Sequence, residues 1–435
     1  MSARDFPLWF ILCSLFMFGA VFGSFLNVCI YRFPKHEKLW DQLRGIWGRS
    51  YCPSCKTEIL ARDNIPILGW LMLGGKCRNC SMKISPRYPL IELLNGLLWV
   101  LLYWFEFPNG VETLWTEQCV AEPELGPGKI VSYVGCWSGP QWMHLRYFFH
   151  IFLIQALLVA TFIDFDLQII PDGSTVPAMI FAVLASTVFG QLFLVPVWFD
   201  DPSNRNMFLE LSPDWLDWIF FDFNPEQFAS AHPHVHGFLV SIVGLVVGGG
   251  SIWVVRIIGF RVLKQEAMGF GDVVLMACIG AFVGWQPVIV VFFLAAMCAM
   301  VSVIVGSIFR RKREIPYGPY ISIGTLLLLL FWKQIWLEWR VKAYFDLGAG
   351  IIFAGIAMAA MLFLSLSLLQ LVKRMLGISM YYQEQHGDWT SADTLAYLHG
   401  ENVDQDQGQW PKKDGWEGTS ASRGQRQERI WRNGR

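Results

Sequence analysis

Two stretches of the sequence place carboxylates beside long apolar segments. Asp164 lies within Thr161–Asp172, at the end of one apolar run, and Asp272 completes Gly269–Asp272 at the start of another. A carboxylate at membrane depth costs about 2.5 to 3.5 kcal/mol on insertion scales, so it is usually retained for a function. Two facing carboxylates can share one proton, one activating water and the other polarising a peptide carbonyl. The pair predicts aspartic protease chemistry.

Each carboxylate in these stretches also has a structural explanation. A Gly-x-Gly-Asp tetrapeptide alone fits a helix N-cap at Asp272, and Asp172, which follows Pro171, fits an N-cap better than a catalytic role. Asp166 is two residues beyond Asp164, and such residues do not share a helix face, so we assign it a supporting or solvated position. The glycines of the tetrapeptide allow a substrate backbone or a neighbouring helix to approach closely.

Four cysteines form the second chemical motif. Cys52, Cys55, Cys77 and Cys80 make two C-x-x-C pairs separated by 21 residues, a spacing typical of a tetrahedral zinc knuckle. Protein sulfurs would fill all four positions, so the zinc is predicted to be structural and not catalytic. The alternative is a set of reduced structural thiols. A reducing cytoplasm argues against disulfides among them.

The composition identifies the elements that must position these groups. The 435 residues are 54% hydrophobic and 16% charged, which is typical of a membrane protein. The apolar runs are continuous and not alternating, so an all-α bundle is favoured over a barrel. Runs long enough to cross a bilayer lie at 8–31, 89–105, 147–163, 173–198, 237–258, 288–309, 320–337 and 349–372, and a shorter one at 273–285. We therefore expect about eight or nine transmembrane helices.

The charges between these runs predict their orientation. Residues 32–88 carry eleven Lys or Arg against four acids, which places this segment in the cytoplasm, whereas 106–146 and 199–236 are acidic and belong outside. The N-terminus is then outside and the C-terminus inside, which requires an odd number of crossings. External Cys119 and Cys136 form either a disulfide or two free thiols.

Four segments follow from this pattern. They are a first transmembrane span at 1–31, a cytoplasmic basic zinc-binding domain at 32–88, a transmembrane core at 89–375 and a polar cytoplasmic tail at 376–435. The tail is rich in Gln, Asp, Gly, Trp and Arg, a composition typical of disorder.

In its motifs and their order, the chain resembles the bacterial type IV prepilin peptidases, which are prepilin leader peptidases and N-methyltransferases of the G-x-G-D membrane aspartic class. The resemblance covers about residues 14 to 336. It rests on Gly23–Val28, Tyr31-Arg32, the CPSC sequence, Asn64–Pro66, Gly75–Arg78, Arg87–Leu93, Asp164–Asp172, Met268–Asp272, Gly284–Gln286 and Ile315–Tyr320.

The resemblance implies a bifunctional enzyme of the bacterial inner membrane. Its partners would be membrane lipid and type IV prepilin or pseudopilin substrates, with no nucleic acid. Asp164 and Asp272 match the catalytic pair of the family, and the zinc-binding loop would belong to a methyl-transfer half that uses S-adenosylmethionine. The donor-binding residues are not indicated, because no Gly-rich cofactor motif is present. Val274 stands where the family often has a Lys, so a role for that Lys does not carry over.

Two other classes of function fit parts of the pattern. A transporter also retains intramembrane carboxylates, but typically near the midplane and between inverted repeats, and the sequence shows no such repeat. A non-catalytic assembly factor would use the zinc knuckle for docking and the carboxylates for helix capping. Cleavage of a prepilin by the purified protein separates the three.

Overall fold

The structure, a computed structural model, describes residues 7–36, 38–52, 54–106, 133–134, 137–197, 210, 228–229, 231–263, 268–308, 316–345 and 350–375. The chain divides into two units. The described part of unit 1 falls within Met1–Trp104 and Gln155–Ser174, and that of unit 2 within Phe105–Ile154 and Thr175–Tyr382. Cys119, Cys136 and the tail at 376–435 lie outside the described residues, so the predictions for them stay predictions.

The described residues are almost entirely helical, as the sequence predicts. Seven helices are long and apolar enough to cross a membrane, and two shorter apolar helices, Phe270–Val283 and Gly318–Leu330, accompany them. These helices agree with the predicted helical membrane bundle, and seven of them are long enough to span the membrane. The strands of the described part are β1 (Tyr133–Val134) and β2 (Trp137–Ser138), which pair antiparallel with Val134 opposite Trp137. The protein is a multi-pass membrane protein.

Unit 1 contains two long helices joined by the cysteine-bearing segment. Its elements are α1 (Leu8–Arg32), η2 (Phe33–Lys35), α2 (Leu39–Gly45), η3 (Ala61–Asp63), α3 (Leu68–Met72), α4 (Arg87–Glu106, apart from its last two residues), the second half of α6 (Gly139–Leu167) and the start of α7 (Asp172–Phe189).

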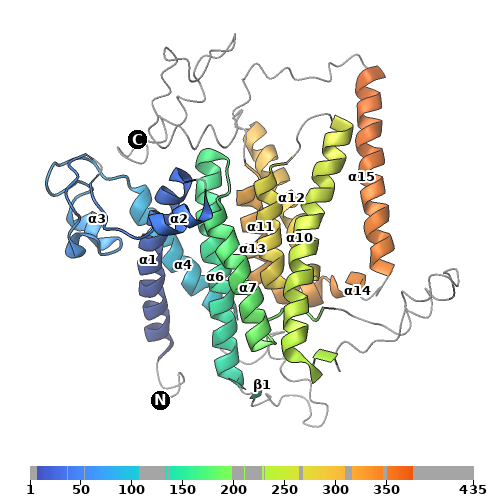
Figure 1. Ribbon diagram of the computed structural model, residues 1–435, viewed down its shortest axis with the longest axis horizontal. Helices are drawn as coiled ribbons and strands as arrows, with labels where there is room; N and C mark the ends of the chain where they lie inside the picture. Colours follow the sequence, from blue (N-terminus) through green and yellow to red (C-terminus); the bar gives the residue numbers. More distant parts are fainter. Residues whose placement is uncertain are drawn as a thin grey trace. The chain divides into compact units, whose positions relative to one another are not determined.

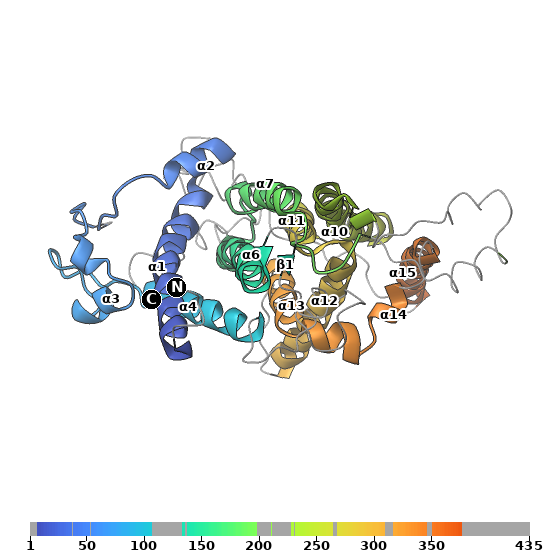
Figure 2. The same ribbon diagram turned by 90° about the horizontal axis from the view of Figure 1, so that it is seen from below.

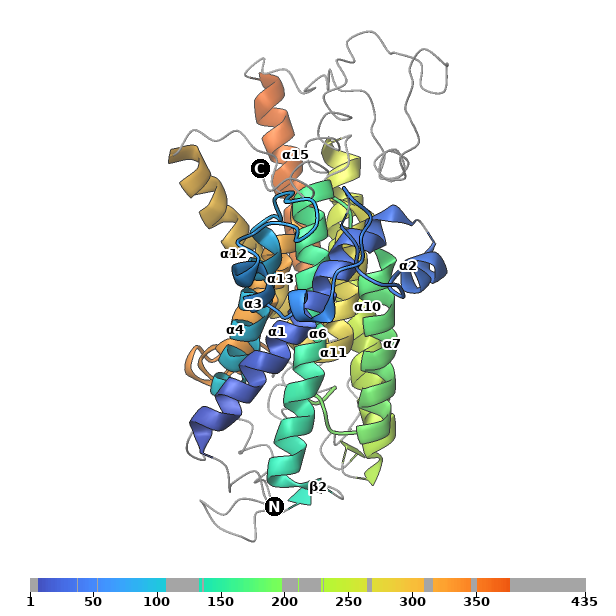
Figure 3. The same ribbon diagram turned by 90° about the vertical axis from the view of Figure 1, so that its left-hand side faces the viewer.

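Helices α1 and α4 lie side by side because small residues of α1 face α4 (Figure 3). A Cβ at Gly19 would lie 2.8 Å from the Trp99 ring, and one at Gly23 would lie 2.8 Å from the Glu92 Cα. Such spacing lets backbones approach closely, the usual role of small residues between membrane helices. The Asn95 amide donates to the Gly19 carbonyl (2.7 Å) and exchanges hydrogen bonds with the Gln155 amide of α6.

A buried glutamine attaches α2 to the start of α7. The Gln42 amide nitrogen donates to the His36 carbonyl at 2.7 Å, and its oxygen accepts the backbone N–H of Gly173 at 2.6 Å. The first N–H groups of a helix have no partner within the helix, so Gln42 satisfies one of them at α7. Asp172 is exposed and lies in the first turn of α7.

Unit 2 is a helix bundle that includes the first half of α6 and most of α7. Its other helices are α10 (Pro233–Leu263), α11 (Phe270–Val283), α12 (Trp285–Ile308), α13 (Gly318–Leu330), the π-helical η5 (Gln334–Glu338), α14 (Lys342–Phe345) and α15 (Gly350–Met375). Helix α10 lies beside α11, and α12 beside α13 (Figures 1 and 2).

Helix α11 forms the core of unit 2, and all of its residues from Asp272 to Val283 except Val274 are buried. It packs on α10 with almost no space between the backbones. A Cβ at Gly244 would lie 2.8 Å from the Gly280 carbonyl carbon, and the Ser241 hydroxyl donates to the Ala281 carbonyl at 2.8 Å. At 14 residues, α11 is about 21 Å long.

Two expected spans are shorter than the sequence predicts. The run at 320–337 forms the 13-residue helix α13, which ends at Leu330. The apolar run at 173–198 continues past the end of α7, which stops at Phe189 because Gly190 adopts a φ of +72°. The segment after Gly190 is apolar because it is buried, with Leu194 0% exposed. The Trp285 indole donates to the Val197 carbonyl (2.5 Å), which fixes this segment against the start of α12.

Candidate functional site

The four predicted cysteines lie together in unit 1. Their sulfur atoms are all within 4.8 Å of one another, with Cys52 and Cys80 at 3.7 Å and Cys55 and Cys77 at 4.0 Å. Tetrahedral zinc with Zn–S bonds of about 2.3 Å requires sulfurs about 3.8 Å apart. The geometry is therefore close to that of a tetrahedral zinc site, and this four-cysteine knuckle agrees with the sequence prediction.

Each C-x-x-C pair is built by the same backbone turn. The N–H of Lys56 donates to the Cys52 carbonyl, and the N–H of Ser81 donates to the Cys77 carbonyl, both at 2.9 Å. Lys56 and Ser81 both have a φ of +57°, a left-handed conformation that folds the chain back. Isolated bridges close the two turns at Tyr51–Glu58 and at Lys76–Lys83. The two turns thus direct their sulfurs toward a common point.

The local hydrogen bonds give the thiols different acidities. Hydrogen bonds from Thr57 lower the pKa of the Cys55 thiol to about 6, and the backbone N–H of Cys80 lowers the pKa of Cys77. Burial raises the pKa of Cys52 to about 11. Thiolates are the form that binds metal, so Cys55 is ready to bind at neutral pH, and zinc must displace a proton from Cys52.

One ion pair within the cysteine-bearing segment and several contacts to α1 and α4 fix the position of the knuckle. Arg78 makes a bidentate ion pair with Asp63, with distances of 2.8 and 2.6 Å. The backbone N–H of Ile67 donates to the buried Glu92 carboxylate of α4 at 2.7 Å. Arg32, at the end of α1, donates to carbonyls at residues 45, 46, 48 and 49. The knuckle is therefore held against α1 and α4, which belong to the same unit of the chain.

Asp164 lies in the last turn of α6 and is 5% exposed. Its carbonyl accepts the N–H of Gln168 at 2.9 Å, and Gln168 has a φ of +59°. A left-handed residue at this position ends a helix. The carboxylate of Asp164 is therefore held at the end of a long apolar helix, as expected for a carboxylate near the membrane interface.

Asp166 has a different environment from Asp164, as the helix geometry predicts. It forms a bidentate ion pair with Arg87, the first residue of α4, at 2.9 and 2.5 Å. Arg87 also lies over the Phe162 ring and donates to the Phe162 carbonyl. Asp166 thus supports the end of α6, and this partner was not identifiable from sequence because 79 positions separate it from Arg87.

Asp272 is the third residue of α11 and is 8% exposed. The N-cap of this helix is Gly269, so Asp272 is not itself the N-cap. Its carboxylate instead interacts with the Gly269 backbone, as an acidic residue does at the third position of a capping box. Tyr317, which precedes α13, interacts electrostatically with Asp272.

Asp164 belongs to unit 1 and Asp272 to unit 2. The pairing of their carboxylates therefore stays a prediction.

Glu92 was not singled out by the sequence reasoning except as part of a longer motif. An acid six residues into an apolar helix was the available signal, and its importance became clear only from its burial.

Comparison with known proteins places these features in a family. Two family models match, the Bacterial Peptidase A24 N-terminal domain at residues 17–106 and the Type IV leader peptidase family at residues 216–304. A prepilin leader peptidase/N-methyltransferase of Klebsiella pneumoniae is 31% identical over 286 residues, covering 66% of this chain and 90% of that protein. The chain belongs to the prepilin leader peptidase/N-methyltransferase family.

Other members of this family show similar coverage. The Pseudomonas aeruginosa prepilin leader peptidase/N-methyltransferase is 29% identical over 355 residues, covering 76% of this chain and 93% of that protein. The Escherichia coli type 4 prepilin-like proteins leader peptide-processing enzyme is 28% identical over 320 residues, covering 71% and 89%. No solved structure matches. The first family model contains the four-cysteine knuckle and the second contains Asp272, whereas Asp164 lies between the matched ranges.

Proposed function

We propose that the protein is an aspartic endopeptidase that removes the leader of type IV prepilin-like proteins and then methylates the new N-terminus. Family membership supports both activities. The observation that carries the peptidase assignment is that Asp164 and Asp272 are buried at the ends of apolar helices, at 5% and 8% exposure. Buried carboxylates are costly unless a function retains them.

In the proposed cleavage, the two carboxylates hold one proton between them. The ionised carboxylate accepts a proton from water, and the water oxygen attacks the scissile carbonyl carbon while the protonated carboxylate donates to the carbonyl oxygen. Breakdown of the tetrahedral intermediate breaks the C–N bond. The leaving nitrogen takes the proton that the first carboxylate accepted from water, and a hydroxyl proton of the intermediate returns to the second carboxylate. Neither residue alone performs both tasks, so both Asp164 and Asp272 are required.

The methyl-transfer half is assigned to the zinc-binding domain at 32–88. Bound S-adenosylmethionine would supply an electrophilic methyl group to the α-amine exposed by cleavage. The methyl–sulfur bond would break, S-adenosylhomocysteine would leave, and one amine proton would be lost to solvent. The unperturbed pKa of an α-amine is about 7.7 to 8.0, so a usable fraction is neutral near pH 7. A cavity of about 750 Å³ beside the knuckle is within the range of small-molecule sites. Zinc has a structural role, because protein sulfurs complete its coordination.

We further propose that the protein lies in the inner membrane with its N-terminus outside and its C-terminus in the cytoplasm. The basic character of residues 32–88 supports this orientation. A substrate with a short basic leader and a following apolar helix would then present its scissile bond at the cytoplasmic interface, where the expected spans place both Asp residues.

The decisive experiment measures cleavage and methylation separately. Asp164→Asn and Asp272→Asn preserve side-chain shape, and each is expected to reduce prepilin cleavage in detergent on the order of 10³-fold or more. Both variants should still methylate a peptide that begins at the mature N-terminus. Asp172→Asn is the matched control, because Asp172 is exposed, and it should cleave at near the parental rate. Near-parental cleavage by Asp164→Asn or Asp272→Asn would refute the assignment.

A further inference from the structure

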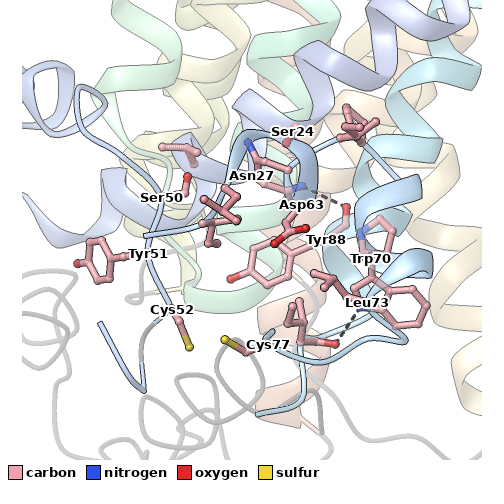
Figure 4. Close-up of a pocket in the computed structure, with 18 of the residues that line it drawn as sticks. Ser24, Asn27, Ser50, Tyr51, Cys52, Asp63, Trp70, Leu73, Cys77 and Tyr88 are labelled. Atoms are coloured by element: carbon pink, nitrogen blue, oxygen red, sulfur yellow. Dashed lines mark hydrogen bonds between the residues drawn. The ribbon is translucent and has the colours of Figure 1, made fainter. Parts of the chain in front are cut away.

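A large cavity in unit 1 has no assigned ligand. It has a volume of about 750 Å³ and lies among α1, the cysteine-bearing loops and the start of α4 (Figure 4). The sulfur-bearing side chains of Cys52 and Cys77 lie at one edge of it. Small-molecule sites typically measure about 300 to 1,000 Å³, so one medium-sized ligand fits.

Aromatic side chains line much of this cavity. Tyr31, Tyr51, Trp70 and Tyr88 all contribute to its surface. The Trp70 indole donates to the Ile84 carbonyl at 3.0 Å, which fixes the orientation of its ring. Oriented aromatic faces favour a planar ring that stacks on them, as the base of a nucleoside does. The walls therefore suit a purine.

Two of the three carboxylates that line the cavity form ion pairs, and the third does not among the described residues. Of its three carboxylates, Glu58 pairs with Arg49 and Asp63 pairs with Arg78. Glu92 is 8% exposed and has hydrogen-bond donors, but no described basic side chain lies within ion-pair distance of it. Its partners are the Ile67 N–H at 2.7 Å and the side chains of Ser24 and Asn27.

Asn27 adds a second acceptor at the same place. It is 4% exposed, and its amide nitrogen donates to the Tyr88 carbonyl at 3.1 Å. Its side-chain oxygen is buried and has no hydrogen-bond partner among the described residues. Leaving a buried acceptor unsatisfied costs about 1 to 3 kcal/mol, so a ligand that supplies N–H donors is favoured here. Glu92 and Asn27 together favour a ligand end that is cationic and donates hydrogen bonds.

We propose that this cavity binds S-adenosylmethionine, with the adenosine against the aromatic side chains and the cationic methionyl end against Glu92 and Asn27. S-adenosylmethionine has both features that the lining favours, a purine at one end and a sulfonium with an ammonium group at the other. The proposal rests on the methyltransferase activity proposed above. It gives that activity a binding site for the methyl donor, in which Glu92 contacts S-adenosylmethionine.

The test compares two ligands on the purified, zinc-loaded full chain in detergent. S-adenosylmethionine carries the cationic end, and methylthioadenosine keeps the purine but lacks that end. For Glu92→Gln, the dissociation constant of S-adenosylmethionine should rise on the order of 10- to 100-fold, the loss expected for a charge-assisted contact. Methylthioadenosine should bind as tightly as it does to the parental protein. Equilibrium dialysis with labelled ligands measures both.

Glu58→Gln is the matched control, because Glu58 lines the same cavity but already pairs with Arg49 in solvent. It should change the binding of neither ligand. The zinc content of Glu92→Gln should stay at the parental value, which excludes misfolding of the knuckle. Equal weakening of both ligands would mean that Glu92 only supports the fold, and unchanged binding of S-adenosylmethionine would also overturn the proposal.

Photochemical labelling separates failure of the site from failure of the function. Ultraviolet irradiation with methyl-labelled donor should mark peptides within residues 24–92. Label confined to unit 2 would overturn the cavity assignment and leave the methyltransferase proposal intact. If the parental protein neither binds the donor nor methylates a pre-cut peptide, while still cleaving prepilin, both the methyltransferase proposal and this inference fail.

Discussion

A methyl group added at Gly244 should separate two helices and displace a proposed catalytic residue. A Cβ there would lie 2.8 Å from the Gly280 carbonyl carbon and 2.9 Å from the Gly284 Cα. Carbon atoms in contact are normally about 3.5 to 4.0 Å apart, so α10 and α11 must move apart by roughly 1 Å. Both neighbours are backbone atoms and cannot rotate away.

This displacement has two expected consequences. Overpacking of this kind costs about 1 to 3 kcal/mol of stability. Because α11 carries Asp272, and a shift of about 1 Å in a catalytic group can reduce a rate about 100-fold, Gly244→Ala should also reduce prepilin cleavage by up to about that factor. Thermal unfolding in detergent and initial rates of leader cleavage measure the two effects.

Gly250 provides a matched control in the same helix. A Cβ there meets nothing within 4 Å, so Gly250→Ala should leave cleavage unchanged and, since alanine favours helix, should not lower the unfolding temperature. If Gly244→Ala unfolds and cleaves like Gly250→Ala, then the close packing of α10 on α11 does not position Asp272, and the reasoning fails.

Single contacts and the charge pattern give four more predictions. Replacing Arg87 or Asp166 alone should destabilise the protein by about 3 to 5 kcal/mol, because it leaves a largely buried charge unpaired. Replacing both by apolar residues should recover most of that loss, and thermal unfolding of the two single variants and the double variant measures the difference. Cys55→Ser should lower bound zinc well below one per chain by metal analysis, while an equal zinc content would refute the four-cysteine site. Gln42→Leu should destabilise the start of α7 by about 1 to 3 kcal/mol, which local hydrogen exchange detects. An engineered thiol near Glu122 should react with an impermeant reagent added outside, and labelling only from the cytoplasmic side would invert the proposed orientation.

The two halves of the proposed chemistry depend on different kinds of structure. The knuckle turns around Cys52 and Cys77 are local, and each is complete within about eight residues. The surroundings of Asp164 and Asp272 are built by packing of long helices, as the Gly244 contact illustrates. We therefore expect zinc loss to impair residues 32–88 first, and helix-packing changes to impair cleavage first.

Helical class and the zinc knuckle were predictable from sequence, because both follow from local patterns. A continuous apolar run must satisfy its backbone hydrogen bonds within itself, so it forms a helix in a membrane. The spacing of two C-x-x-C motifs is typical of a shared metal site, and the structure brings sulfurs of the two turns to within 3.7 and 4.0 Å of each other. The separation of Asp164 from Asp166 also followed from helix periodicity alone.

Other features were decided by contacts between distant parts of the chain. The end of α7 at Phe189 was not readable from hydropathy, because the buried segment after Gly190 is as apolar as a membrane span. The pairing of Asp166 with Arg87 and the isolation of Glu92 from any described cation depend on which helices are neighbours. Composition determines that a residue is costly to bury, whereas the tertiary structure determines which group, if any, offsets that cost, because only packing brings side chains far apart in sequence within hydrogen-bond distance.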